Sequence, residues 1–276
     1  MRKLLRANFA RLKKSTVFWV CMIVMFLLGI VLPLVHYSDK IQSHYEVPLD
    51  NGFFSYAIFV VILASVFTSL YIGTEYSDGT IRNKIIIGQK RVKIYLSNLI
   101  ICICAGVFFC IAHLIPYLCI GIPLLGFFES GILPILLFMF SILIMMTAFI
   151  ALFTLLSMLV QSKAISAVIC LLTTFCLLLF GSFIFARLSE PEYYEGYSYT
   201  QNGITTTQEQ EKNSLYLEGT KREIFQFLLD FTPGGQVIQL SGMETGHPEV
   251  LICYSLILII TTTGIGIPVF QKKDLK

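Results

Sequence analysis

The residues best suited to chemistry lie in one polar stretch, residues 73–91, which reads GTEYSDGTIRNKIIIGQKR and separates two apolar runs. The acids Glu75 and Asp78 come first, and basic residues follow them. Between the two groups, Gly79 and Thr80 can end one helix and begin another, because glycine adopts left-handed backbone angles and threonine caps helix N-termini. This order of features indicates a polar element that a partner protein could grip.

A short amphipathic helix is predicted to follow this joint. Its apolar face would consist of three isoleucines, Ile81, Ile85 and Ile86. Arg82 and Lys84 would form a basic face, and Gly88 would end the helix. A partner that grips such a helix could tilt the two neighbouring spans together, because packed helices transmit displacement. The alternative interpretation is an interfacial loop that only anchors the bundle.

The sequence contains no motif for catalysis or ATP hydrolysis. It has no G-x-x-x-x-G-K-[ST] phosphate loop, no H-E-x-x-H and no G-x-S-x-G. The apolar segments contain no ionised residue, the usual sign of ion coupling. Polar residues that could line a path through the membrane are Ser97, Asn98, His113, Thr173 and Thr174. We therefore expect no catalytic residue, no metal site and no bound cofactor, so a separate protein would have to supply energy for uphill transport.

The whole chain is too apolar for a soluble fold. Of its 276 residues, 56% are hydrophobic and 13% charged, and the mean hydropathy is +0.78, whereas soluble domains hold about 25% charged residues. Six segments reach the roughly 20 apolar residues that cross a bilayer, and they are residues 16–35, 53–72, 95–118, 133–160, 164–186 and 250–270. These spans predict an all-α integral membrane protein with six transmembrane helices and both termini on one side.

The basic residues are divided unequally between the two sides of the membrane. Six precede the first span, five lie between the second and third, one lies between the fourth and fifth, and three are in the tail. The other side has one base outside its long last loop. The positive-inside rule therefore predicts that both termini are cytoplasmic. A basic surface beside membrane spans suits anionic lipid headgroups, so we expect lipid contact and no nucleic-acid binding.

Three regions follow from this topology. Residues 1–186 would form a membrane domain with the first five spans and a coupling segment at 73–93, residues 187–249 an extracellular loop between the fifth and sixth helices, and residues 250–276 the last span and tail. The bases and leucines of residues 1–14 predict a helix lying in the inner interface, and the alternative is a frayed basic tail. Three prolines between 116 and 134 predict a re-entrant or broken segment near residues 119–132.

The extracellular loop has two halves with different patterns. In the first, Asn202-Gly203 between alternating residues predicts a hairpin with a type I′ turn, and a disordered loop is the alternative. In the second, Thr220 to Glu223 fits a capping box for an apolar helix that Pro233 and two glycines would end. The candidates on this helix for an outer gate, or merely a lid, are Phe225, Leu228 and Phe231.

Two short motifs resemble those of a known family. The stretch EYSDGTIRNKIIIGQKR resembles the E-Y-x-x-G-T-[IL]-[RK] segment of the type 2 ABC transporter permeases, in the branch for export of, or immunity to, peptides such as bacitracin and lantibiotics. The tail FQKKDLK is similar to the closing F-x-x-[KR]-D-[ILV] pattern of that family. The six spans, the basic interfacial helix and the large last outer loop are also similar to its layout.

The resemblance implies a permease subunit that does not hydrolyse ATP itself. Two copies of a cytoplasmic ABC ATPase subunit, which bind ATP and Mg²⁺, would dock between the second and third spans, and a second permease, identical or homologous, would complete the path. On the matching positions, Glu75 would face the ATPase cleft, Tyr76 would fill the aromatic position, Gly79 and Thr80 would form the joint, and Arg82 would be a contact or headgroup anchor.

The function expected from these features is export of an antimicrobial or other amphipathic peptide. An acidic outer face with an apolar helix would attract a cationic, membrane-active cargo. The absence of cysteine from residues 187–249 fits a bacterial plasma membrane. Two alternatives remain open: a membrane sensor or assembly protein that binds an outside ligand through residues 187–249, and a carrier that works without ATP. Co-purification of an ATPase would distinguish them.

Overall fold

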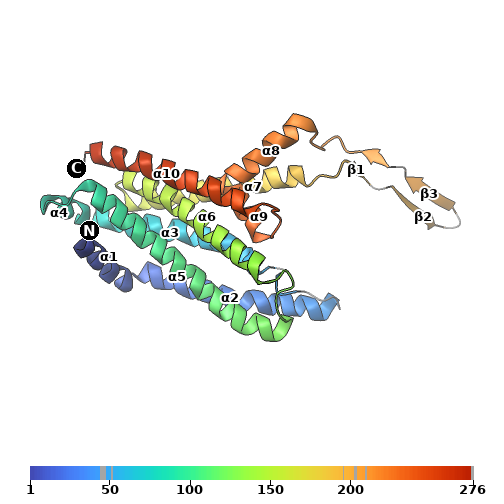
Figure 1. Ribbon diagram of the computed structural model, residues 1–276, viewed down its shortest axis with the longest axis horizontal. Coiled ribbons are helices and arrows are strands. Elements are labelled where there is room, and N and C mark those ends of the chain that lie inside the picture. Colours follow the sequence, from blue (N-terminus) through green and yellow to red (C-terminus); the bar gives the residue numbers. More distant parts are fainter. Residues whose placement is uncertain (44–47, 51, 195, 202–203, 209, 275–276) are drawn as a thin grey trace.

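The computed structural model describes residues 1–43, 48–50, 52–194, 196–201, 204–208 and 210–274. Within them, six helices are long and apolar enough to cross a membrane, and they run side by side as a bundle (Figure 1). These helices are α2 Thr16–Ser43, α3 Tyr56–Ser77, α5 Arg91–Leu125, α6 Ile132–Leu159, α7 Lys163–Leu188 and α10 Pro248–Lys272. The prediction of an all-α integral membrane protein with six spans is confirmed.

Helix α3 lies at the centre of the bundle, where it packs against α5, α6 and α7, and a short 3-10 turn, Phe53–Ser55, leads into it. The outer helices pack on the neighbours of α3: α2 packs against α5, and α10 packs against α6. In the most apolar stretch of α3, 61% of the residues are buried, against 22% in α7 and 17% in α10. The peripheral helices therefore present apolar faces that the chain itself does not cover, as helices facing lipid or another membrane subunit do.

One end of the bundle, which we call the terminal end, holds α1 Arg2–Lys14, α4 Thr80–Ile86 and the last turn of α10 (Figure 1). The strands lie at the opposite end. Helix α1 buries Leu4, Asn8 and Leu12 against the bundle. The predicted N-terminal helix is therefore confirmed, and the alternative of a frayed tail is wrong.

The predicted break near residues 119–132 is wrong, because α5 continues through Pro116 and Pro123 to Leu125. This helix has 35 residues and so a length of about 52 Å. Helix α2 packs closely against this proline, since a Cβ added to Gly29 would lie 2.7 Å from the Pro116 ring. Neighbouring helices that pack this closely allow a transmembrane helix to pass through proline.

The loop between α7 and α10 begins with short strands that point away from the bundle (Figure 1). Strand β1 Tyr193–Tyr194 pairs with β4 Glu211–Lys212, and β2 Tyr197–Gln201 pairs antiparallel with β3 Ile204–Gln208. The paired strands confirm the hairpin over the disordered alternative. The predicted type I′ turn at Asn202-Gly203 lies outside the described residues.

Two helices follow the strands, α8 Gly219–Phe231 and α9 Pro233–Ser241. The predicted capping box is wrong, because the N-cap of α8 is Glu218 and no side chain caps the helix. Pro233 ends α8 as expected, but it also starts α9, whose N-cap Thr232 accepts a hydrogen bond from the Gly235 amide at 3.4 Å. Proline suits both roles, since it favours the first position of a helix.

Helix α9 enters the bundle instead of lying on it. It packs against α7, α6 and α3, with Val237 and Leu240 fully buried. Gly234 contacts the backbone of Leu177, which lies eleven residues, or roughly 16 Å, from the end of α7 at Leu188. Residues 233–241 therefore form a short helix that packs inside the bundle, where the sequence had predicted none.

Candidate functional site

The candidate site is centred on Glu75, on the last turn of α3, whose side chain has no exposed surface. Arg11 of α1 and Lys84 of α4 both form ion pairs with its Oε1 atom. The Asn98 amide of α5 donates a hydrogen bond to Oε2 at 2.6 Å. One carboxylate thus joins α1, α4 and α5 to α3.

Asn8 of α1 completes the network around this carboxylate. Its Oδ1 accepts a hydrogen bond from Lys84 at 3.1 Å, its Nδ2 donates to Asn98 Oδ1 at 3.0 Å, and its carbonyl accepts from the Tyr71 hydroxyl at 2.9 Å. The guanidinium of Arg11 lies 3.7 Å above the Tyr71 ring. We call this group the Glu75 cluster, and its members are Asn8, Arg11, Tyr71, Glu75, Lys84 and Asn98.

The charges of the Glu75 cluster depend on one another. Burial lowers the pKa of Lys84, and the neighbouring Glu75 carboxylate opposes that shift. Taking a charge out of water is expensive unless an opposite charge and hydrogen bonds replace the solvent, and here the carboxylate has both. Because α4 has only seven residues, its inward-facing lysine is a principal attachment to the bundle.

Three sequence predictions are corrected here. Glu75 does not face outward towards a partner, because it is buried beneath α4. The absence of ionised groups holds for residues 53–72 but not for the whole helix, since α3 continues to Ser77 and includes this acid. Lys84 is not on an exposed basic face but lies inward beside Ile81, three residues earlier on the same helical face, while Ile86 is 75% exposed.

The joint between α3 and α4 lies at Gly79, which has φ 65° and is the N-cap of α4. The Gly79 amide donates to the Tyr76 carbonyl at 3.1 Å, which closes the end of α3. No side chain caps α4, so Thr80 is its first residue and not its cap. At the other end, Gly88 has φ 83°, and the amides of Gly88 and Gln89 donate to carbonyls of the last turn. This pattern is a Schellman motif, which confirms that Gly88 ends the helix.

Replacing Gly79 by valine is expected to destabilise the protein by roughly 1–2 kcal/mol, because a branched residue is strained at positive φ. Asparagine tolerates this conformation better, so Gly79→Asn should lose less. A Cβ at this position meets no atom within 4 Å, so the difference reports the backbone angle alone. Thermal unfolding in detergent measures it, with Gly246→Val as a control at an open position without positive φ. Equal losses for the valine and asparagine variants at Gly79 would contradict this account.

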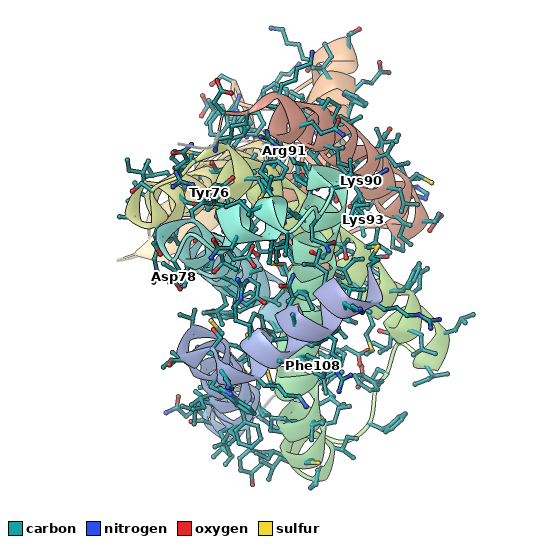
Figure 2. The ribbon with its side chains drawn as sticks, turned by 90° about the vertical axis from the view of Figure 1, so that its left-hand side faces the viewer. Tyr76, Asp78, Lys90, Arg91, Lys93 and Phe108 are labelled. Carbon is teal, nitrogen blue, oxygen red and sulfur yellow. The ribbon has the colours of Figure 1, made fainter. Side chains whose placement is uncertain are left out.

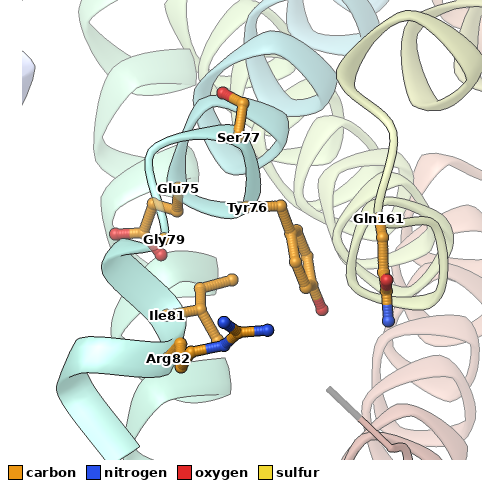
Figure 3. Close-up of a pocket in the computed structure, with 7 residues that line it drawn as sticks. All are labelled: Glu75, Tyr76, Ser77, Gly79, Ile81, Arg82 and Gln161. Atoms are coloured by element: carbon orange, nitrogen blue, oxygen red, sulfur yellow. The ribbon is translucent and has the colours of Figure 1, made fainter. Parts of the chain in front are cut away.

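A cavity of about 230 Å³ opens beside the joint (Figure 3). Its exposed lining includes Ser77, Arg82 and Gln161, and Tyr76 forms one wall. The Tyr76 hydroxyl donates to the Met158 carbonyl at the end of α6, at 2.7 Å. The cavity therefore lies between the joint and the end of α6.

The chain's tail contacts the same region. Lys273 donates to the Met158 carbonyl at 2.9 Å and lies 4.8 Å from the centre of the Tyr76 ring. Burial lowers the pKa of this lysine. Gln161 donates to the Asp274 carbonyl at 3.1 Å, and Arg91 donates to the Gln271 carbonyl at 2.8 Å. The tail motif thus fastens α10 to α5 and α6.

The exposed surface of the terminal end has two parts in the end-on view of Figure 2. Tyr76 and Asp78 lie on one side of the joint, and the bases Lys90, Arg91 and Lys93 lie on the other. Asp78 and Arg82 are exposed, as a contact surface requires. Among the described residues, no group of three or more His, Cys, Asp or Glu side chains could hold a metal ion.

The structure brings all six predicted coupling residues together, which are Glu75, Tyr76, Asp78, Gly79, Thr80 and Arg82. Sequence reasoning missed Asn8 and Arg11, although one signal was present. Asn8 lies four residues from both Leu4 and Leu12, so it falls on the apolar face of α1. A polar residue at such a position is expected to have a buried partner.

The three proposed gate residues lie at the opposite end of the molecule. Phe225 and Leu228 pack against a small apolar cluster that joins α8 to α7. Phe231 stacks on Phe227 at 5.5 Å and contacts Tyr254 edge-on. Their role as a gate stays a prediction.

Comparison with known proteins places most of the chain in a described family. The model of a family described as ABC-2 family transporter protein matches residues 4–181. The matched region is more than half of the chain and contains every member of the Glu75 cluster. No curated protein matches the chain.

Proposed function

The chain belongs to the ABC-2 transporter family, and we propose that this permease subunit works in an ATP-driven exporter of amphipathic peptides. Permeases of this family generally partner with an ATPase subunit in a lipid bilayer. In our proposal the ATPase is a separate cytoplasmic chain in two copies, which bind ATP and Mg²⁺. A second permease, identical or homologous, completes the transport path.

The observation that carries the proposal is the attachment of α4 to three other helices through one carboxylate. An ATPase could grip the exposed face of α4, which carries Arg82, together with Asp78 just before the helix. A change in the nucleotide state of the ATPase would then displace α4. Because Lys84 joins α4 to Glu75, and Arg11 joins Glu75 to α1, the displacement would pass to α1, α3 and α5 together. No reaction on the permease itself is needed.

The distribution of charge supports an orientation with the terminal end in the cytoplasm. Bases are concentrated on α1 and between α3 and α5, close to the ends of the spans. Exposed acids gather beyond the other end of the bundle, and they include Glu129, Glu192, Glu211, Glu218, Glu244 and Glu249. Such a surface favours a cationic cargo or product. We also propose that the protein lies in a bacterial plasma membrane and that it belongs to the branch of the family that exports peptides.

The uncovered faces of α7 and α10 support a second permease. These two helices have the smallest buried share among the spans in the described chain. Their exposed residues are large and apolar, and they include Leu172, Phe175, Leu179, Phe183, Ile257 and Ile260. Six helices enclose little room for a peptide, so a path between two permeases fits the cargo better.

The proposal is tested by isolating the chain in detergent from its native cells and identifying any ABC ATPase that accompanies it. We expect the ATPase to co-purify, and Arg82→Glu to reduce its amount by about tenfold or more, since a like-charge contact costs several kcal/mol. Lys93→Glu makes the same charge change at an exposed base on the other side of the joint, and it should retain the ATPase.

Two results would contradict the proposal. Flux through the purified permease without ATP would indicate a carrier. Ligand binding through residues 187–249 with neither flux nor a retained ATPase would indicate a sensor.

A further inference from the structure

An apolar groove runs along the outside of the bundle between α2 and α5. It consists of two adjacent cavities of about 370 and 340 Å³, which share Trp19, Met22 and Phe108. One cavity extends along the spans to Leu27 and Ile115, and the other ends at α1. Both volumes fall within the range of about 300–1,000 Å³ that is usual for small-molecule sites.

The length of the groove matches one leaflet of a bilayer. Between Phe18 and Leu27, which line its two ends on α2, the helix rises about 14 Å. Half of a hydrocarbon core of about 30 Å is about 15 Å. An acyl chain that lies along the groove would therefore reach from the interface to the middle of the membrane.

The end of the groove at α1 is basic. Lys13 lines it beside Phe9 and is exposed. Arg6, three residues before Phe9 and seven before Lys13, lies on the same face of α1 and is also exposed. In the described structure neither cavity has an acidic residue in its lining. Two cations thus lie where the headgroup of a lipid in the groove would be.

Trp19 forms the boundary between the basic and apolar parts. Its indole N–H donates a hydrogen bond to the Lys13 carbonyl at 2.9 Å, which holds the ring at the groove. Tryptophan is common at this depth, where its ring contacts acyl chains and its N–H faces the interface. Figure 2 shows Phe108, on the opposite wall, next to α1.

We propose that this groove is a binding site for one anionic phospholipid from the leaflet that contacts α1. One acyl chain lies between Trp19 and Phe108, and the phosphate contacts Lys13 and Arg6. Charge complementarity selects an anionic headgroup, because basic side chains at the membrane surface attract such lipids. A second copy of the chain is better accommodated by α7 and α10, whose apolar stretches are less covered by the chain itself.

Fluorescence tests the site directly, because Trp19 is the single tryptophan of the chain. The full chain is reconstituted in vesicles of phosphatidylcholine with a minor fraction of phosphatidylglycerol, and bromine on acyl chains quenches the indole. In one preparation all the phosphatidylglycerol is brominated, and in the other an equal amount of phosphatidylcholine is. Lipid composition and bromine content are then identical. We expect stronger quenching when phosphatidylglycerol carries the bromine.

Variants separate the groove from diffuse attraction to α1. Lys13→Gln and Arg6→Gln should each lower the preference for phosphatidylglycerol by about fivefold. Lys14→Gln removes the same charge one residue away, where the side chain lines a different cavity, and should keep the preference. Ala112→Phe fills the groove and should abolish it, whereas Ala164→Phe, on an exposed position of α7, should not.

Two outcomes would overturn the proposal. Equal quenching by the two brominated lipids would show that Trp19 contacts only bulk lipid. An equal loss of preference in Lys13→Gln and Lys14→Gln would show that the whole basic helix, and not the groove, attracts the lipid. Both charge variants involve exposed side chains, so this comparison holds even if Ala112→Phe does not fold.

Discussion

Glu75→Gln is expected to lower the stability of the bundle by about 3–5 kcal/mol, because it leaves the buried Lys84 and the partly buried Arg11 without their counter-charge. Arg11 and Lys84 both pair with the lost carboxylate, and the single oxygen of the new amide could not accept from these cations and from Asn98 on the other side. The cluster joins four helices, so the loss should affect their unfolding together. Thermal unfolding of the purified protein in detergent measures the change.

Asp78→Asn is the matched control for this variant. It removes an acid three residues further along the chain, but Asp78 is exposed, so we expect a change within about 0.5 kcal/mol. Adding Lys84→Met to Glu75→Gln removes one unpaired cation and should recover part of the loss. If Glu75→Gln were as stable as Asp78→Asn, the Glu75 cluster would not hold these helices together.

The double variant Glu75→Gln/Lys84→Met also tests how the permease is coupled to its ATPase. With Glu75 and Lys84 both replaced, α4 can remain folded but lacks its ionic link to α3. We expect the partner ATPase to bind this double variant and to hydrolyse ATP without driving export. Retained export would show that displacement of α4 reaches the spans by another route.

The sequence predicted the spans and the joint because their causes are local. A run of apolar residues is sufficient to define a membrane helix, and Gly79 is sufficient to end one, since a left-handed residue is needed there. Helix α4 could also be predicted from the local residue pattern between Gly79 and Gly88. These elements would be predicted equally well in any protein with the same local pattern.

The Glu75 cluster could not be predicted in the same way. The polar residues after position 72 suggested an exposed surface, whereas Glu75 is buried where other helices supply its partners. Arg11 and Glu75 are far apart in the sequence, and no local periodicity relates them. Lys84 fits an exposed basic face by spacing, and only its distant partner shows that it lies inward.

Helix α9 was missed for a different reason. Pro233 and the two glycines after it were interpreted as a stop, which is correct for α8, but the same residues begin α9. The glycines serve close packing here, since Gly234 and Gly181 bring the backbones of α9 and α7 together. Such a contact depends on tertiary structure, and the sequence around residue 234 does not reveal it.

Gly234→Ala is expected to displace α9 and to destabilise the protein by at least about 3 kcal/mol, near the upper end for an overpacked core. A Cβ at this position would lie 1.8 Å from the Leu177 carbonyl oxygen, and a backbone atom in a packed helix cannot move aside as a side chain does. Gly181→Ala, from the other side of the contact, should act in the same direction, since its Cβ would lie 2.5 Å from the Gly234 carbonyl carbon.

Polar groups add to the effect of displacing α9. Gln236 donates to the Asp230 carbonyl at 2.9 Å and accepts from Ser255, and Gln239 donates to the Asp230 carboxylate at 3.0 Å. Both glutamines are buried, so a shift of α9 would leave buried amide groups without partners, and each such group costs about 1–3 kcal/mol. Thermal unfolding and hydrogen exchange over residues 233–241 would report the displacement.

Gly264→Ala, on α10 with no atom within 4 Å of the added Cβ, is the control and should be neutral or slightly stabilising. Equal stability of the Gly234 and Gly264 variants would mean that α9 does not pack at this depth.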